Sequence, residues 1–209
     1  MHRLVLGLAL LLGSVLFMAP AVGQPASDPD SRSPDASAEA LHKAQQNHLW
    51  RVGVWGGANA VGGLALMLAS SRSRRPGRWN FGAMTAGWGA VNVGIAAVGL
   101  LAASPPTAEA AAVLDAERQF HDILLFNLGL NVAYSAVGGT MLAAGYRDVE
   151  NAARWRGFGS SLVLQGAGLL VLDGVAFMAS RTRLAGLLDP TTAVSLQPLP
   201  TGLALTAHF

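Results

Sequence analysis

Four runs of about twenty residues dominate this chain, and they contain almost no charge. They are residues 52–70, 81–104, 123–145 and 157–180, and the only acidic or basic side chain among them is Asp173 in the last run. A helix of about twenty apolar residues crosses the ~30 Å hydrocarbon core of a bilayer. We therefore predict an all-α, polytopic membrane protein whose residues 39–180 form a four-helix transmembrane bundle.

The charged residues flank these runs instead of forming a face of their own. Only 12% of the chain is charged, and thirteen arginines stand against a single lysine, Lys43. This placement predicts a lipid bilayer as the main partner and argues against nucleic-acid binding. Cysteine is absent, which excludes disulfides, thiolate metal sites and cysteine nucleophiles.

Both ends of the chain differ in composition from the bundle. Residues 1–23 have a basic start, an apolar centre and small residues at the end, which predicts a cleaved signal peptide; an uncleaved anchor helix is the alternative. Residues 24–38 are rich in Pro, Ser and Asp and predict a flexible linker. A short interfacial helix, with Ser37 as its N-cap, is expected to run into the first span.

Residues 181–209 are predicted to be an external C-terminal tail. Leu203, Leu205 and Ala207 alternate, as the residues of an extended strand do. We expect a loose tail, with a strand as the alternative.

Arginine bias between the spans predicts how the protein lies in the membrane. The first and third connections are rich in arginine, whereas residues 105–122 are mainly acidic. Because arginine-rich loops stay in the cytoplasm, we expect both mature termini to lie outside it. With a signal peptide, this arrangement predicts a multi-pass protein of a bacterial inner membrane.

The two halves of the bundle carry similar short patterns. Gly-x-Asn occurs at Gly57 and again at Gly129, about 72 residues later, and Arg-Trp followed by Phe-Gly begins at Arg78 and again at Arg154. A duplicated two-helix unit in one orientation would explain both matches, and chance similarity of Gly/Ala-rich segments is the alternative.

The same segments resemble an uncharacterised family of four-span bacterial membrane proteins, a domain of unknown function met chiefly in Bacteroidetes-like bacteria. The resemblance covers roughly residues 45–180 and implies a shared fold without an activity. Asn131 departs from it, because an aspartate is expected there. Its most specific elements are Trp88-x-x-Val91-Asn92, Asn127 with Tyr134, and Gln165-Gly166 followed by Asp173.

Polar side chains recur inside the apolar runs. With a rise of 1.5 Å per residue, Asn59, Asn131 and Asp173 each lie roughly 10 to 12 Å below the outer boundary. Polar groups in hydrocarbon are costly unless they are paired, so they should face inward. The predicted intramembrane polar pocket comprises Asp173, Asn59, Asn92, Asn127, Asn131, Tyr134 and Gln165.

Two interpretations of this pocket stay open. The amides can hold helices together by hydrogen bonds worth about 0.6 to 2 kcal/mol each, helped by small residues at four-residue spacing, namely Gly53, Gly57, Ala90 and Gly94. A carboxylate at Asp173 instead suggests a group that meets water, a proton or a cation.

The sequence contains no motif that brings catalytic residues together. Glu117, His121 and Asp122 form either a weak metal site or, as we expect, a solvated helix end, and Ser160 and Ser161 have no base beside them in sequence. We predict no catalytic, metal or cofactor-binding residue. The expected function is assembly or interaction with a membrane-protein partner or a second copy; the alternative is a transporter or channel-like protein that binds a small solute, proton or cation at Asp173.

Overall fold

The described part of the chain forms four long helices and a short β-hairpin. The computed structural model describes residues 33–188, 194–199 and 202–207. The helices are α2 (Pro34–Leu68), α3 (Pro76–Ala102), α4 (Ala110–Ala144) and α5 (Ala152–Leu187), and the strands are β1 (Val194–Leu199) and β2 (Gly202–Ala207). The predicted signal peptide lies outside the described residues, as do residues 24–32 of the predicted linker.

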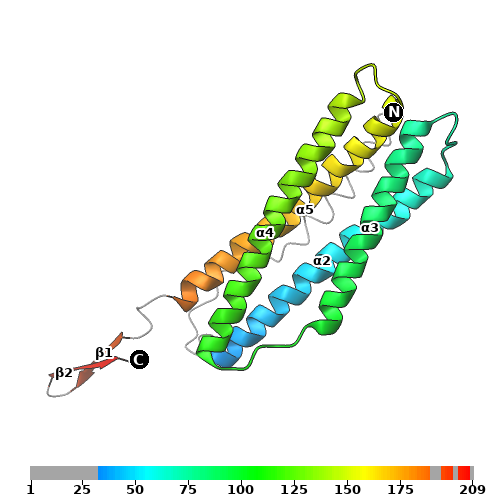
Figure 1. Ribbon diagram of the computed structural model, residues 1–209. Coiled ribbons are helices and arrows are strands. Elements are labelled where there is room, and N and C mark those ends of the chain that lie inside the picture. The colour runs from blue at the N-terminus through cyan, green and yellow to red at the C-terminus, as the bar shows by residue number, and fades with distance from the viewer. Residues whose placement is uncertain (1–32, 189–193, 200–201, 208–209) are drawn as a thin grey trace.

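The helices form two antiparallel pairs, α2 with α3 and α4 with α5 (Figure 1). The α2–α3 and α4–α5 loops lie at the same end of the bundle, here called the loop end. The α3–α4 connection, residues 103–109, lies at the opposite end, here called the crossover end. The two pairs contact each other mainly through α3 and α5, whereas α3 and α4 stand apart.

Helix α2 begins earlier than the sequence indicated. Its N-cap is Ser33, whose hydroxyl oxygen accepts a hydrogen bond from the Ala36 amide at 3.2 Å, and Pro34 occupies the first helical position. The expected N-cap at Ser37 is therefore wrong, and residues 34–38 are helical instead of belonging to a linker. The expected interfacial helix and first span are one continuous 35-residue helix.

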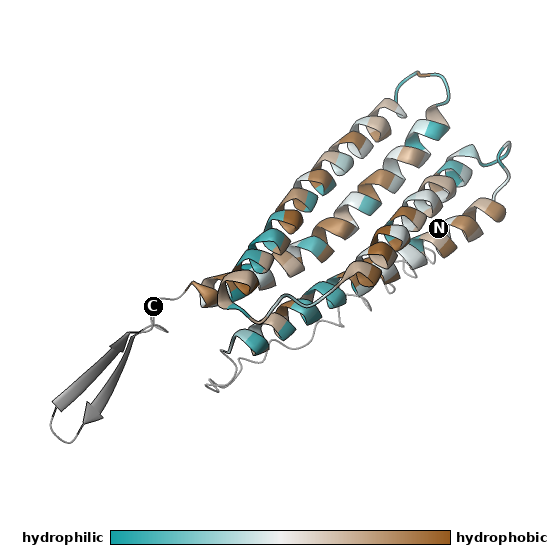
Figure 2. Ribbon diagram, turned by 60° about the horizontal axis from the view of Figure 1, so that its bottom comes forward, coloured by the Kyte–Doolittle hydropathy of each residue, from teal (hydrophilic) through white to brown (hydrophobic). Residues whose placement is uncertain are grey.

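Three helices, α3, α4 and α5, are long and apolar enough to cross a membrane, which marks the chain as a membrane protein. The apolar part of α2 is shorter, because it lies between Arg51 and the helix end at Leu68. Figure 2 shows hydrophilic residues in the loops and in the first turns of α2, and hydrophobic residues along the middle of the helices. The helical bundle is confirmed, and the fourth span stays a prediction.

At the crossover end the helices continue beyond the predicted spans, and a partly buried ion pair lies between α4 and α5. Leu41, Phe120, Leu124 and Ala176 form a core cluster there. Next to it, Glu117 is only 1% exposed and accepts hydrogen bonds from Arg183 Nε at 2.9 Å and Nη2 at 3.0 Å. The expected solvated helix end is wrong at Glu117, because Arg183 of α5 neutralises the carboxylate.

Within each pair, the helices approach most closely at glycines. A Cβ on Gly63 would lie 2.6 Å from the Gly82 carbonyl oxygen, and one on Gly138 would lie 2.9 Å from the Gly159 carbonyl oxygen. Any larger residue would force the two backbones apart, so these glycines fix the distance between the paired helices.

The close approach was expected at other small residues, and this expectation is wrong at two of them. A Cβ on Gly57 or Gly94 would meet nothing within 4 Å. The contact stripe of α2 contains Gly56 instead, where a Cβ would lie 2.8 Å from the Gly89 carbonyl oxygen. Adjacent glycines made the face of the helix ambiguous from spacing alone.

The C-terminal tail contains an antiparallel hairpin, in which Leu196 pairs with Leu205 and Leu199 pairs with Gly202. The strand indicated by the alternation at residues 203–207 is confirmed by β2, and the expectation of a loose tail is wrong for these residues. The hairpin lies beyond the end of α5, apart from the helices (Figure 1).

The glycine contacts predict opposite effects for two neighbouring substitutions. Gly63→Ala places a methyl group against the α3 backbone and should lower the stability of the bundle by about 1–3 kcal/mol, as overpacking does. Gly62→Ala points into open space and should be neutral or stabilise by up to about 1 kcal/mol, because alanine favours helix. Thermal unfolding of the detergent-solubilised protein, followed by circular dichroism, compares them; equal melting temperatures would disprove the contact.

Candidate functional site

Asp173 lies on α5 towards the crossover end and is 4% exposed. Asn131 of α4 donates a hydrogen bond from Nδ2 to Asp173 Oδ2 at 2.6 Å. The second carboxylate oxygen, Oδ1, lies 3.1 Å from Nε2 of His48, which comes from α2. Three helices therefore meet at this carboxylate, and each of its oxygens has a polar partner.

His48 was not among the residues that the sequence pointed to. It is 7% exposed, and its ring meets Phe120 edge-on with the ring centroids 6.1 Å apart. A periodic pattern could have revealed it, because His48, Val52, Trp55 and Asn59 follow helical spacing and are all buried. The predicted first span begins at Val52, so His48 falls in the predicted interfacial helix that precedes it.

The His48–Asp173 pair is largely shielded from water. A contact of 3.1 Å between Nε2 of His48 and Oδ1 of Asp173 requires a hydrogen on one of the two atoms, because two lone pairs would repel each other. The other ring nitrogen, Nδ1, then remains available for a second partner.

A cavity of about 700 Å³ lies beside this pair. Its walls are mainly α3 and α4, which stand apart, and α2 and α5 close it behind. Trp88 and Tyr134 face each other across the gap with ring centroids 4.9 Å apart. The polar side chains that line the cavity are Gln45, His48, Asn92, Ser104, Gln119, Asn127, Asn131, Tyr134 and Asp173.

Five of the seven residues predicted to share a pocket line this cavity: Asp173, Asn92, Asn127, Asn131 and Tyr134. The other two, Asn59 and Gln165, bind each other outside the lining. Gln165 donates from Nε2 to Asn59 Oδ1 at 2.7 Å, and Asn59 donates from Nδ2 to the Trp55 carbonyl at 2.7 Å. The predicted set therefore divides into a cavity wall and a bridge between α2 and α5.

Among the described residues, two buried polar atoms of side chains that line the cavity have no hydrogen-bond partner. They are Nδ2 of Asn92, a residue that is 3% exposed, and Nδ1 of His48. A buried polar group without a partner costs about 1–3 kcal/mol. Neighbouring protein atoms cover both, so the surface that the cavity offers to a bound molecule comes from other atoms of its polar lining.

Nearer the loop end, serine and threonine side chains inside the bundle form hydrogen bonds between helices and within them. Thr85 and Ser161 lie 2.8 Å apart between their hydroxyl oxygens and connect α3 to α5. Ser160 donates to the Arg156 carbonyl of its own helix at 2.8 Å. Both serines thus have structural partners, and the described residues bring together no group of three or more histidine and acidic side chains suited to a metal.

These features define a class: a helical membrane protein with a cavity beside a buried histidine–aspartate pair. The family model described as a family of unknown function (DUF6992) matches residues 51–174, more than half of the chain, and the chain belongs to this family. The match includes Asp173 and ends one residue after it, whereas His48 precedes it. No curated protein and no solved structure matches the chain.

The pair contact can be tested with a double-mutant cycle. His48→Ala leaves the buried Asp173 carboxyl group without its imidazole partner and should lower the free energy of unfolding by about 3–5 kcal/mol. Asp173→Ala combined with His48→Ala should cost less than the two single changes together, with a coupling of about 0.5–3 kcal/mol. Unfolding of the natural protein and of the three variants, each solubilised in detergent, gives the four free energies of the cycle.

His42→Ala is the matched control, because His42 lies on the same helix and contacts the Gln46 side chain. It should change stability by less than ~1 kcal/mol. Strict additivity of the His48 and Asp173 changes would contradict a direct interaction.

Proposed function

We propose that this protein is a small integral membrane protein that holds a small molecule in the cavity beside His48 and Asp173 and catalyses no reaction on it. The observation that carries the proposal is the convergence of polar side chains from all four helices on an open cavity. A transport role at the same residues is consistent with this site.

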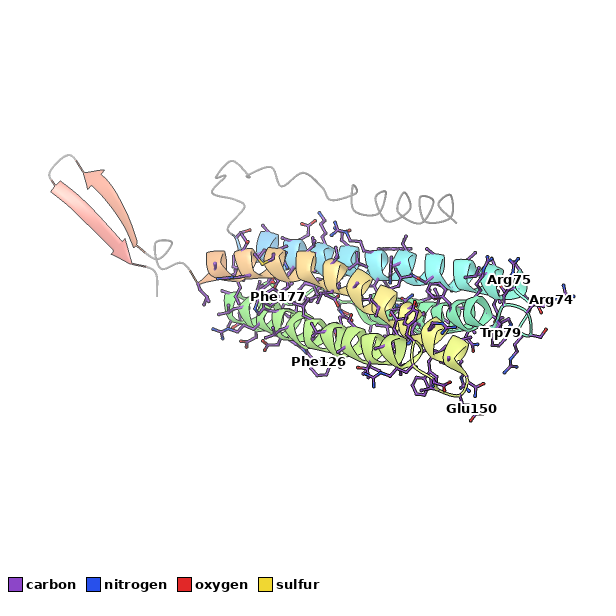
Figure 3. The ribbon with its side chains drawn as sticks, turned by 90° about the horizontal axis from the view of Figure 1, so that it is seen from above. Arg74, Arg75, Trp79, Phe126, Glu150 and Phe177 are labelled. Atoms are coloured by element: carbon purple, nitrogen blue, oxygen red, sulfur yellow. The ribbon has the colours of Figure 1, made fainter. Side chains whose placement is uncertain are left out.

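A second function, assembly with another membrane component, is favoured by a different observation. The bundle exposes large apolar side chains on α4, and Figure 3 shows Phe126 pointing away from the helices. Phe126 is 67% exposed and needs lipid or a protein partner to cover it. Lipid alone is sufficient for this, so ligand binding remains the leading proposal.

The proposal includes four spans in a bacterial inner membrane, with both mature termini outside the cytoplasm. The α2–α3 loop, the α4–α5 loop and the first turns of α5 lie at the same end and together contain Arg72, Arg74, Arg75, Arg147, Arg154 and Arg156; Figure 3 places Arg74, Arg75 and Glu150 there. Loops that share a side of the bundle and are rich in arginine support a cytoplasmic loop end. The cavity would then face the outer half of the bilayer.

We also propose that the two helix pairs are repeats of one ancestor. The closely packed glycines support this idea, since Gly63 and Gly138 occupy equivalent places 75 residues apart, and Gly82 and Gly159 do so 77 residues apart. The first spacing revises the offset of about 72 residues inferred from the Gly-x-Asn patterns. A parallel repeat would relate the pairs by an axis along the membrane normal.

Native mass spectrometry of the purified protein tests the binding proposal. The natural sequence should carry an additional small-molecule mass after mild solubilisation. Ile95→Trp adds bulk at the wall of the cavity and should abolish that mass, while Val98→Trp adds the same bulk on an exposed part of α3 outside the lining and should retain it. A bare natural protein, or equal retention by both variants, would contradict ligand binding in this cavity.

Single cysteines test the membrane arrangement, because the natural chain contains none. Asn47→Cys and Thr107→Cys should react with a membrane-impermeant maleimide in intact spheroplasts. Ser73→Cys, in the α2–α3 loop, should react only after the membrane is opened. Reaction of Asn47→Cys and Ser73→Cys from the same side would exclude α2 as a span.

A further inference from the structure

We propose that the cavity binds a neutral, lipid-soluble molecule that carries a hydroxyl or carbonyl group on an apolar chain. This inference rests on the proposed binding function and names the class of ligand. It follows from where the cavity opens, and from the charges and the polar groups that line it.

The cavity is lined mainly by α3 and α4, two helices apolar enough to cross a membrane that make few contacts with each other, and we infer that it opens sideways between them. Ile95 of α3 and Ile123 of α4 line it and are 57% and 50% exposed, so they form its rims. In a bilayer such rims contact acyl chains. A ligand that enters between them comes from the lipid phase and must itself be soluble there.

The wall of the cavity is mainly apolar, and this favours a ligand with a long apolar part. Leu49 and Val52 of α2, Leu130 of α4 and Leu169 of α5 line it together with the two isoleucines. The lining reaches from Ser104 at the crossover end to Trp88 and Tyr134 deeper in the bundle. Along this path an alkyl or prenyl chain would replace lipid contacts with protein contacts.

Charge in the lining selects against ions. Among the described residues that line it, His48 and Asp173 are the only histidine or acidic side chains, and none is a lysine or an arginine. An anionic headgroup would face the Asp173 carboxylate with no other cation to compensate. A cationic headgroup would compete with His48 for the same carboxylate, whose other oxygen already accepts from Asn131. A neutral headgroup avoids both costs.

The polar lining indicates what the headgroup needs. The carboxamides of Asn92 and Asn127 belong to this lining. A carboxamide can donate a hydrogen bond to a carbonyl or hydroxyl oxygen, and its own oxygen can accept one from a hydroxyl. A neutral headgroup with a hydroxyl or carbonyl group therefore fits this lining.

Photolabelling with three tail-matched probes tests this class. The full-length protein in liposomes is exposed to diazirine-bearing hexadecanol, hexadecanoate and hexadecylamine, and the labelled peptides are mapped by mass spectrometry. The alcohol should label the α3 and α4 segments around Ile95 and Ile123 about tenfold more than either ion does, since a tenfold preference corresponds to ~1.4 kcal/mol. Ile95→Trp should remove this labelling and Val98→Trp should preserve it.

Asp173→Asn tests the role of charge separately from the size of the cavity, because it removes the carboxylate and keeps the side-chain volume. Without the carboxylate, labelling by hexadecanoate should rise towards that of the alcohol. Equal labelling by all three probes in the natural protein, or label spread evenly over the outer surface of the bundle, would overturn the proposal.

Competition distinguishes the sources of such a molecule. If a short-chain prenyl quinone displaces the alcohol probe, the natural ligand is a carbonyl-bearing ring on a prenyl chain. If dioctanoylglycerol displaces it, the natural ligand is a glycerolipid. Displacement by neither overturns the proposed class. A bound mass that Ile95→Trp abolishes, together with a preference for a charged probe, would leave the binding function standing and reject only the neutral ligand.

Discussion

The burial of one carboxylate determines the arrangement of the crossover end of this bundle. Asp173 lies where neither water nor a lysine can neutralise it, so its partners must come from the neighbouring helices. His48 and Asn131 supply them from two other helices. Since α2 and α5 otherwise make few contacts, this pair is a principal connection between the two halves of the protein at this end. The length of α2 is consistent with this demand, because a helix that began at the first apolar run, at Val52, would start after His48 and leave it out.

The helices pack differently at the two ends of the bundle. Nearer the loop end, glycines bring the paired backbones together, and short hydroxyl and amide bridges join the two pairs. Nearer the crossover end, α3 and α4 diverge and the cavity lies between them. Close packing gives the fold its stability, and the divergence produces room for a ligand. Both properties arise from where small residues occur along otherwise similar helices.

Much of this architecture could be predicted from sequence, because hydrocarbon imposes strict rules. Uncharged runs gave the helices, and the cost of buried polar groups pointed to Asp173, Asn131 and Asn92 as inward-facing residues. What could not be predicted depends on rotation and on long-range pairing. Adjacent glycines, such as Gly56 and Gly57, leave the contact face undecided. The partner of Asp173 lies 125 residues away, on a segment whose polar composition resembled a membrane surface helix.

Glu117 shows the same difficulty on a smaller scale. Its neighbours His121 and Asp122 suggested an exposed helix end. Arg183 follows the last apolar run on α5, and its side chain contacts the Glu117 carboxylate of α4. Only the continuation of α5 beyond its apolar part places that arginine within reach. Charges that flank an apolar run can thus belong to the protein interior when the helices extend past the bilayer.

The extent of α2 has a practical consequence for how this family is delimited. The segment shared with DUF6992 starts at Arg51, three positions after the histidine that contacts its buried acid. A fragment trimmed to that segment would retain the acid and discard its counterpart, and Leu41 of the core cluster would go with it. Expression of the domain by itself calls for a boundary at or before Ser33.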